Sequence, residues 1–175
     1  MDLKKYIRSI PDYPKKGILF RDITTLIKNQ YAFKECIDQM SKILAKLNYD
    51  KIAAVESRGF IFASPLSYSL SKPYILIRKK NKLPAETYSV DFKLEYGNST
   101  LEIHKDSINP KEKIIIVDDL IATGGTSEAA AKLVEKCGGE VGGFIFVINL
   151  FDLGGKKLLE KKGYKTFSLI DFPGH

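Results

Sequence analysis

The stretch IIIVDDLIATGGTSEAAA, residues 114–131, decides the fold class. Its first four residues, Ile114–Val117, are all β-branched and predict a strand that is buried on both faces. Two aspartates follow, and a turn of small residues then leads into a helix that is expected to close at Gly138 and Gly139. A strand, a tight turn and a helix in this order form one βα unit of a parallel sheet.

The same pattern recurs on both sides of this stretch. Short apolar runs predict three more strands, and helical spacing of apolar residues predicts three helices. The expected strands are Ile52–Val55, Tyr74–Ile77 and Phe144–Ile148, and the expected helices are Leu3–Ile10, Tyr31–Leu47 and Phe60–Leu70. Strands without a polar face that alternate with helices indicate a doubly wound α/β fold, with a mostly parallel sheet and helices on both faces.

One segment, about 79–104, interrupts this alternation. Apolar residues alternate with polar ones over 88–94 and again over 101–103, with Gly97 and Asn98 between them. This pattern predicts an antiparallel hairpin that turns at Gly97 and Asn98. The hairpin is either a lid that projects over a site or an insertion without a role. Because no linker or repeat divides the chain, residues 1–175 are expected to form a single domain.

The composition describes a basic globular chain. It has 175 residues and a formal charge of +7, from 28 Lys and Arg against 21 Asp and Glu. A chain of this size can fold without disulfides or structural metal, which excludes small disulfide scaffolds and disordered tails. Four of the basic residues are arginines: Arg8, Arg21, Arg58 and Arg78. Arginine is the side chain for bidentate phosphate recognition, so these four matter more than the net charge, which does not by itself indicate nucleic-acid binding.

Thiol, metal and membrane chemistry receive little support from the sequence. Cys36 and Cys137 lack metal-ligand spacing and lie on the apolar stripes of expected helices, so we expect buried, reduced thiols. With His104 and His175 as the histidines, a His-ligated metal centre is not expected. The amino-terminal segment has no long apolar core, and no stretch reaches the roughly 18 apolar residues of a membrane span. We therefore expect a cytoplasmic protein without membrane or nucleic-acid partners.

The turn after the first strand has the composition of a phosphate site. Its residues are Ala122, Thr123, Gly124, Gly125 and Thr126. The N-terminus of the helix that follows offers unpaired N–H groups at the carboxyl end of a parallel strand, where ligands bind in such sheets. The turn has neither a P-loop nor a dinucleotide fingerprint. Asp118 and Asp119 beside it would suit the hydroxyls of a ribose whose 5-phosphate lies in the turn, although both could simply cap an ordinary βα turn.

Residues 117–126, VDDLIATGGT, resemble the phosphoribosyl-pyrophosphate motif of the type I phosphoribosyltransferase family. Five more segments resemble those of the family's adenine-using members, in the same order along the chain. They are DYPKKGILFRDIT (12–24), ESRGFIFASPL (56–66), IRKKNKLPAET (77–87), LEYG (94–97) and NLFDLGG (149–155). The resemblance covers nearly the whole chain, including the expected hairpin.

This resemblance implies the type I phosphoribosyltransferase fold and a reaction of purine salvage. The 5-phosphoribosyl group of phosphoribosyl pyrophosphate would pass to adenine, giving AMP and pyrophosphate. It also implies Mg²⁺, held mainly by substrate oxygens and water rather than by protein ligands, and a homodimer.

The resemblance further implies a role for each matching residue. Glu95 would be the catalytic carboxylate that exchanges a proton with the imidazole ring of the purine. Asp118 and Asp119 would bind the ribose hydroxyls, and Ala122–Thr126 the 5-phosphate. The pyrophosphate-binding residues would be Ser57, Arg58, Arg78, Lys79 and Lys82, often with a cis peptide bond between Glu56 and Ser57. The adenine-binding residues would be Leu19, Phe20, Arg21 and Leu150, with Phe20 stacked on the base.

Several alternatives stay open. Arg58 could instead cap a helix or form an ion pair, and Phe20 could belong to the core. The alternative enzyme is a phosphoribosyltransferase for an oxygen-bearing purine. The alternative of another class is a regulator that senses phosphoribosyl pyrophosphate and binds nucleic acid, although the residues that a DNA-binding module would need already match the enzyme. Arg78 is the candidate for an arginine that reaches across a dimer interface.

Overall fold

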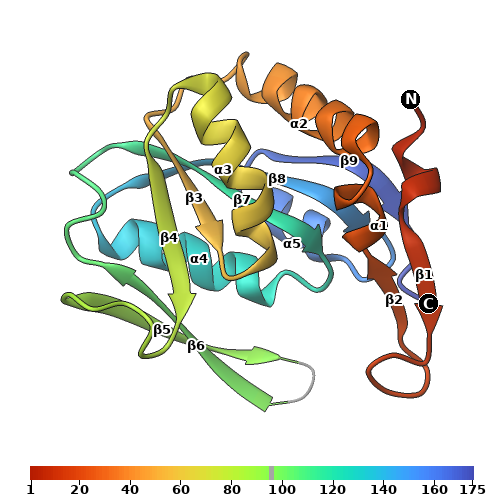
Figure 1. Ribbon diagram of the computed structural model, residues 1–175. Coiled ribbons are helices and arrows are strands. Elements are labelled where there is room, and N and C mark those ends of the chain that lie inside the picture. The colour runs from red at the N-terminus through yellow and green to blue at the C-terminus, as the bar shows by residue number, and fades with distance from the viewer. Residues whose placement is uncertain (95–96) are drawn as a thin grey trace.

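Seven strands form one mixed sheet in the order β5-β6-β4-β3-β7-β8-β9 (Figure 1). The computed structural model describes residues 1–94 and 97–175. The strands are β3 (Lys51–Val55), β4 (Tyr74–Lys79), β5 (Thr87–Leu94), β6 (Gly97–His104), β7 (Lys113–Ile121), β8 (Glu140–Leu150) and β9 (Thr166–Phe172). Strands β4, β3, β7, β8 and β9 pair in parallel, whereas β6 pairs antiparallel with β4 and with β5. The mostly parallel sheet predicted from the sequence is confirmed.

Helices cover both faces of this sheet. They are α1 (Thr24–Ile27), α2 (Gln30–Leu44), α3 (Arg58–Leu70), α4 (Gly125–Lys136) and α5 (Gly155–Lys161). Figure 1 shows α2 and α3 on one side of the sheet and α4 on the other. Two apolar clusters correspond to these layers, one that includes Met40 and Phe62 and one that includes Leu133 and Leu159.

The position of β7 between two helical layers explains why residues 114–117 are all apolar. Ile115 and Val117 belong to the cluster under α2 and α3, while Ile114 and Ile116 belong to the cluster under α4. Alternate side chains of a strand point to opposite faces, so a strand between two helical layers needs apolar residues at every position. The strand is longer than expected, and its last residues include both aspartates of the VDD motif.

The expected helix over Leu3–Ile10 is wrong in its second half. A single 3₁₀ turn spans Leu3–Tyr6, and β1 (Arg8–Pro11) follows it. β1 pairs antiparallel with β2 (Leu19–Asp22) and makes a separate two-stranded sheet. Leu3 and Ile7 are buried, so the apolar spacing marks residues that enter the core, whereas the pairing of the two strands decides the backbone conformation.

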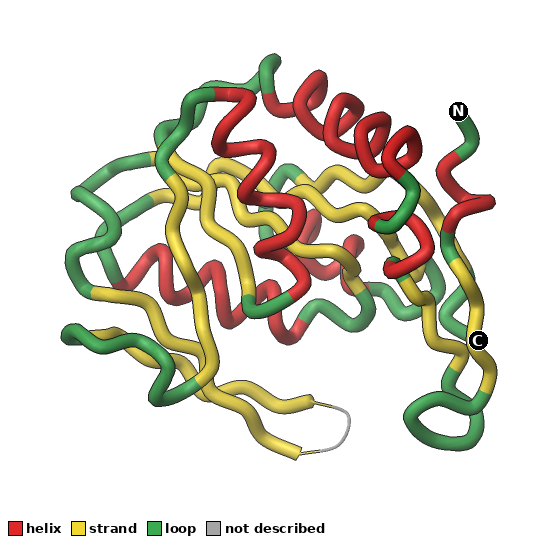
Figure 2. Tube along the Cα trace, in the orientation of Figure 1, coloured by secondary structure: helices red, strands yellow, loops and turns green. Residues whose placement is uncertain are grey.

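The expected hairpin is present as β5 and β6 and extends the central sheet. Arg78 and Lys79 at the end of β4 pair with β6, and Lys136 of α4 donates a 2.9 Å hydrogen bond to the backbone oxygen of Ser89 in β5. The predicted turn position is wrong, because Gly97 and Asn98 are the first residues of β6. Figure 2 shows the hairpin and the β1–β2 sheet flanking the region where the central strands end.

The end of α4 lies where the sequence predicts it, and one of the two cysteines is buried as predicted. Gly138, with φ of +86°, and Gly139 close α4 through hydrogen bonds to Glu135 and Val134. Cys36 is a buried free thiol whose pKa burial raises to about 12, whereas the free thiol of Cys137 is only half-buried. None of the helices among residues 1–94 and 97–175 is long and apolar enough to cross a membrane.

Candidate active site

A cavity of about 680 Å³ lies where β7 and β8 end. Its walls come from segments far apart in the sequence: the β1–β2 loop, the start of α3, the end of β5, the β7–α4 turn and the end of the chain. The lining residues are Pro14, Lys16–Leu19, Arg58, Lys93, Leu94, Asp118–Ser127, Leu150, Leu153, Gly174 and His175. The cavity therefore brings together Asp118, Asp119 and the whole expected phosphate loop.

The β7–α4 turn has the geometry of an anion site. Gly124 takes a φ of +94°, which favours glycine, and α4 begins at the next residue without a side-chain cap. The first N–H groups of a helix have no partner within it, and the helix dipole adds positive potential there. Thr123 and Thr126 add hydroxyl groups at the cavity wall. A phosphate group placed against this turn could accept hydrogen bonds from backbone N–H groups and from these hydroxyls.

The closing motif NLFDLGG supports this turn from outside. Gly155 at the start of α5 donates its backbone N–H to the carbonyl oxygen of Ala122 at 2.9 Å. A Cβ atom at Gly155 would lie 2.4 Å from that oxygen and 2.8 Å from the backbone nitrogen of Gly124. Only glycine permits this approach, so the second glycine of the motif is required by the shape of the phosphate loop.

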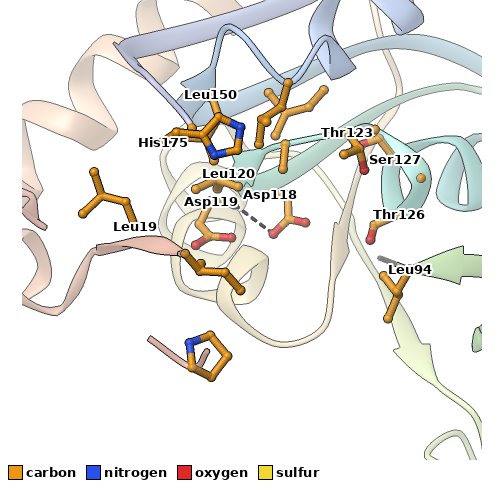
Figure 3. Close-up of a pocket in the computed structure, with 18 of the residues that line it drawn as sticks. Leu19, Leu94, Asp118, Asp119, Leu120, Thr123, Thr126, Ser127, Leu150 and His175 are labelled. Atoms are coloured by element: carbon orange, nitrogen blue, oxygen red, sulfur yellow. Dashed lines mark hydrogen bonds between the residues drawn. The ribbon is translucent and has the colours of Figure 1, made fainter. Parts of the chain in front are cut away.

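Asp118 and Asp119 line the same cavity as this loop, and their environments differ. Burial and the adjacent negative charge of Asp119 raise the pKa of Asp118 well above its usual range. Asp118 accepts a 2.8 Å hydrogen bond from the backbone N–H of Asp119, drawn as a dashed line in Figure 3. Asp119 is 3% exposed and is paired with a cation. Two carboxylates held this close to a cavity favour a ligand that offers hydroxyl groups or positive charge.

Arg58 supplies the cation. Its Nε donates to Oδ2 of Asp119 at 2.7 Å, and its guanidinium carbon lies 5.7 Å from the centre of the Phe20 ring. Arg58 starts α3 directly after Ser57, and the peptide bond between Glu56 and Ser57 is cis, as the resemblance implies. About half of the Arg58 side chain is exposed, so the guanidinium can reach a ligand in the cavity. Arg58 thus forms an ion pair, as the alternative had it, but its partner Asp119 is itself a residue of the cavity.

The other expected pyrophosphate-binding residues gather around Glu56 rather than on the cavity wall. Arg78 donates to both carboxylate oxygens of Glu56, at 3.2 and 3.3 Å, and also to the backbone oxygen of Lys82. The backbone N–H of Lys79 completes the group at 2.9 Å. Burial alone would raise the pKa of Glu56, but these hydrogen bonds and the charge of Arg78 lower it. Glu56 therefore holds a cationic cluster beside Ser57.

The expected adenine-binding residues divide into two groups. Leu19 and Leu150 line the cavity, and Figure 3 shows them on the side away from Thr123 and Thr126. Among the described residues, Phe20 and Arg21 fall outside the lining. The Phe20 ring meets Tyr13 edge-on at 5.2 Å and lies under Arg58, so the alternative that it belongs to the core is wrong for this half-buried ring. The buried Arg21 side chain donates to Ser9 and to the backbone oxygen of Pro173.

Several of the lining residues are not among the site residues predicted from the sequence. Lys93 and Leu94 line the cavity from the end of β5, and their position directly before Glu95 was an available signal. Glu95 itself lies outside the described residues. Gly174 and His175 also line the cavity, and no motif pointed to them.

Comparison with known proteins identifies relatives over nearly the full length. The model of the phosphoribosyl transferase domain matches residues 22–174. The adenine phosphoribosyltransferase of Pelagibacter ubique is 66% identical, with 100% of both chains covered. The crystal structure of adenine phosphoribosyltransferase from Thermoanaerobacter pseudethanolicus is 50% identical, with a TM-score of 0.93 and 98% of each chain covered. The Saccharomyces cerevisiae enzyme, complexed with an imino-altritol bisphosphate and adenine, is 34% identical, with a TM-score of 0.88 and 97% of each chain covered.

Proposed function

This chain belongs to the adenine phosphoribosyltransferase family, and we propose that the cavity at the end of β7 is its active site. The reaction is purine salvage: the 5-phosphoribosyl group of phosphoribosyl pyrophosphate passes to adenine, giving AMP and pyrophosphate. The observation that carries the proposal is that one cavity holds the anion-binding turn, the aspartate pair and Arg58. These are the groups that a phosphate, a ribose and a diphosphate require.

The ribose 5-phosphate occupies the turn Ala122–Thr126 and is held by backbone N–H groups and the hydroxyls of Thr123 and Thr126. Asp118 and Asp119 accept hydrogen bonds from the ribose hydroxyls. Their negative charge also stabilises the electron-poor, oxocarbenium-like ribose carbon that forms as the bond to pyrophosphate breaks. Leu19 and Leu150 flank the base, Phe20 stacks on it, and backbone groups around Leu19 and Arg21 read its amino edge.

Pyrophosphate leaves toward Ser57, Arg58 and the cationic cluster of Arg78, Lys79 and Lys82 around Glu56. The described residues contain no group of three or more His, Cys, Asp and Glu side chains that could hold a metal ion. Mg²⁺ would therefore be held at this site mainly by substrate oxygens and water, as is usual for this ion. When bound there, it neutralises charge on the leaving diphosphate.

Glu95 exchanges a proton with the imidazole ring of the purine, and the hairpin of residues 79–104 acts as a lid over the cavity. Support for the lid comes from Lys93 and Leu94, which line the cavity at the end of β5. All 175 residues form one catalytic domain in this proposal. The enzyme acts in the cytoplasm as a homodimer, in which Arg78 completes the partner's pyrophosphate site. Sedimentation at the mass of a monomer, with full activity, would rule the dimer out.

The activity is tested with radiolabelled adenine or guanine, phosphoribosyl pyrophosphate and Mg²⁺. We expect rapid formation of AMP from adenine, little product from guanine and none without Mg²⁺. Product from guanine at the same rate would indicate the enzyme for oxygen-bearing purines. No product from either base would overturn the proposal.

Replacing Arg58 with alanine is expected to weaken binding of phosphoribosyl pyrophosphate and of pyrophosphate by about 10- to 100-fold. One charge-assisted hydrogen bond contributes about 1.5–3 kcal/mol. The measurement is the KM for phosphoribosyl pyrophosphate and product inhibition by pyrophosphate. Arg8→Ala is the matched control, because Arg8 also pairs with a buried aspartate, Asp22, but away from the cavity. Equal effects of the two substitutions would contradict the assignment of Arg58.

A further inference from the structure

We propose that the tail Pro173–His175 forms a wall of the adenine subsite and that the imidazole of His175 contacts the bound base. This inference rests on the proposed function. It adds a base-site residue that no sequence motif indicates. It also gives Arg21 a positioning role that acts through the tail rather than through contact with adenine.

Two hydrogen bonds from different elements hold the tail in place. Arg21 of β2 donates to the carbonyl oxygen of Pro173 at 2.8 Å, and the backbone N–H of Gly174 donates to Oδ1 of Asp152 at 2.6 Å. The Arg21 guanidinium also lies over the ring of the buried Phe172, 4.4 Å from its centre. A segment that is tied on both sides in this way presents its next residue in a defined direction.

The packing of Gly174 sets the position of His175 still more tightly. Gly174 is buried, and a Cβ atom there would lie 2.6 Å from Cγ of Leu153 and 2.9 Å from Oδ1 of Asp152. Leu153 is itself a cavity-lining residue. A larger side chain at position 174 would therefore require the tail, or the Leu153 and Asp152 side chains that hold it, to shift, and either change would disturb the position of His175.

His175 lies at the base side of the cavity. Figure 3 shows its ring beside Leu150, on the opposite side of the aspartates from Thr126 and Ser127, where the 5-phosphate would be. Leu150, Leu120 and Leu19 line the same cavity, and their apolar side chains offer adenine a surface to pack on but no hydrogen bonds. A neutral imidazole has one donor and one acceptor nitrogen, and the edges of adenine carry both complementary groups. An exposed ring in this position can also stack on the base.

The first test is His175→Ala. We expect the KM for adenine to rise about three- to tenfold, the range for loss of one hydrogen bond. The KM for phosphoribosyl pyrophosphate should not change, because His175 lies on the side of the cavity away from Thr126. His175→Gln should recover part of the loss, since its amide keeps a donor and an acceptor. The dissociation constant of AMP, measured by calorimetry, should rise in parallel with the KM for adenine.

The second test separates base contact from a purely structural role. Gly174→Ala should raise the KM for adenine when His175 is present and add little in the His175→Ala background, because both changes remove the same contact. Gly142→Ala is the matched control, because Gly142 lies outside the cavity lining and a Cβ atom there would come no closer than 3.5 Å to its neighbours. We expect it to behave like the wild type.

Three results would decide against the inference. An unchanged KM for adenine in His175→Ala would overturn it while leaving the proposed function intact, provided that the wild type forms AMP. Additive effects of the two substitutions, or equal rises in both KM values, would show that the tail only supports the shape of the cavity and that His175 does not contact the base. Wild-type protein that neither forms nor binds AMP would overturn the inference and the proposed function together.

Discussion

Replacing Asp118 and Asp119 together with asparagine is expected to lower kcat/KM for phosphoribosyl pyrophosphate by about 10²–10³-fold, the usual cost of removing electrostatic stabilisation aimed at a transition state. Both carboxylates line the cavity beside the anion-binding turn. Asparagine keeps the shape of each side chain but removes the negative charge that stabilises a cationic ribose. The KM for adenine should change little, because the base lies on the other side of the pair.

Although it is expected to impair catalysis, the single substitution Asp118→Asn is expected to stabilise the folded protein. In the folded protein, burial and the charge of Asp119 raise the pKa of Asp118, so its ionised form is unfavourable there. Stability is therefore lost as pH rises through this raised pKa, and asparagine removes that loss. The free energy of unfolding of Asp118→Asn should exceed that of the wild type near neutral pH. The difference should shrink as pH falls toward the ordinary pKa of an aspartate, and urea unfolding at several pH values measures it.

Asp38→Asn is the control for both measurements, since Asp38 is a partly exposed aspartate on α2 that pairs with Lys34. Its kinetics and its unfolding should match those of the wild type. Unaffected kinetics in the double Asp118 and Asp119 variant would instead mean that the two residues merely cap the β7–α4 turn.

Glu95→Gln is expected to lower kcat by about 10²–10⁴-fold, the contribution of a general acid or base that is in place. Leu94, the residue before it in the chain, lines the cavity. Glutamine has nearly the same size and polarity but cannot exchange the proton of the purine ring. The KM values for both substrates should therefore stay close to those of the wild type.

Single-turnover kinetics measure this effect most cleanly, because they exclude product release. Glu160→Gln on α5 is a suitable control, since Glu160 is exposed and outside the cavity lining. Near-wild-type turnover of Glu95→Gln, with unchanged binding, would show that the proton-transfer role is wrong.

The parts of the site that the sequence predicts well are local. The strand, the aspartate pair and the phosphate turn are consecutive in the chain, so their composition alone indicates how they meet. The hairpin is equally local, because alternation of apolar and polar residues marks both of its strands. Its turn was misplaced at Gly97 and Asn98, which pair with Leu94 and Lys93 across the hairpin.

The parts that could not be predicted depend on contacts between distant residues. Apolar spacing suggested a helix through Ile10, but pairing with Leu19–Asp22 makes a strand from Arg8 onward. The contact of Gly155 with Ala122 joins two turns that no local pattern links. Arg21 matched a base-binding motif, yet its side chain holds Pro173, which lies 152 positions later in the chain.

The most direct test of this account is a crystal structure of the enzyme with AMP bound. We expect the phosphate within hydrogen-bond distance, about 3 Å, of backbone nitrogens in the turn Ala122–Thr126. The ribose hydroxyls should contact Asp118 and Asp119, and the base should lie between Phe20 and Leu150. AMP bound with its phosphate elsewhere, or with its ribose away from both aspartates, would contradict the account.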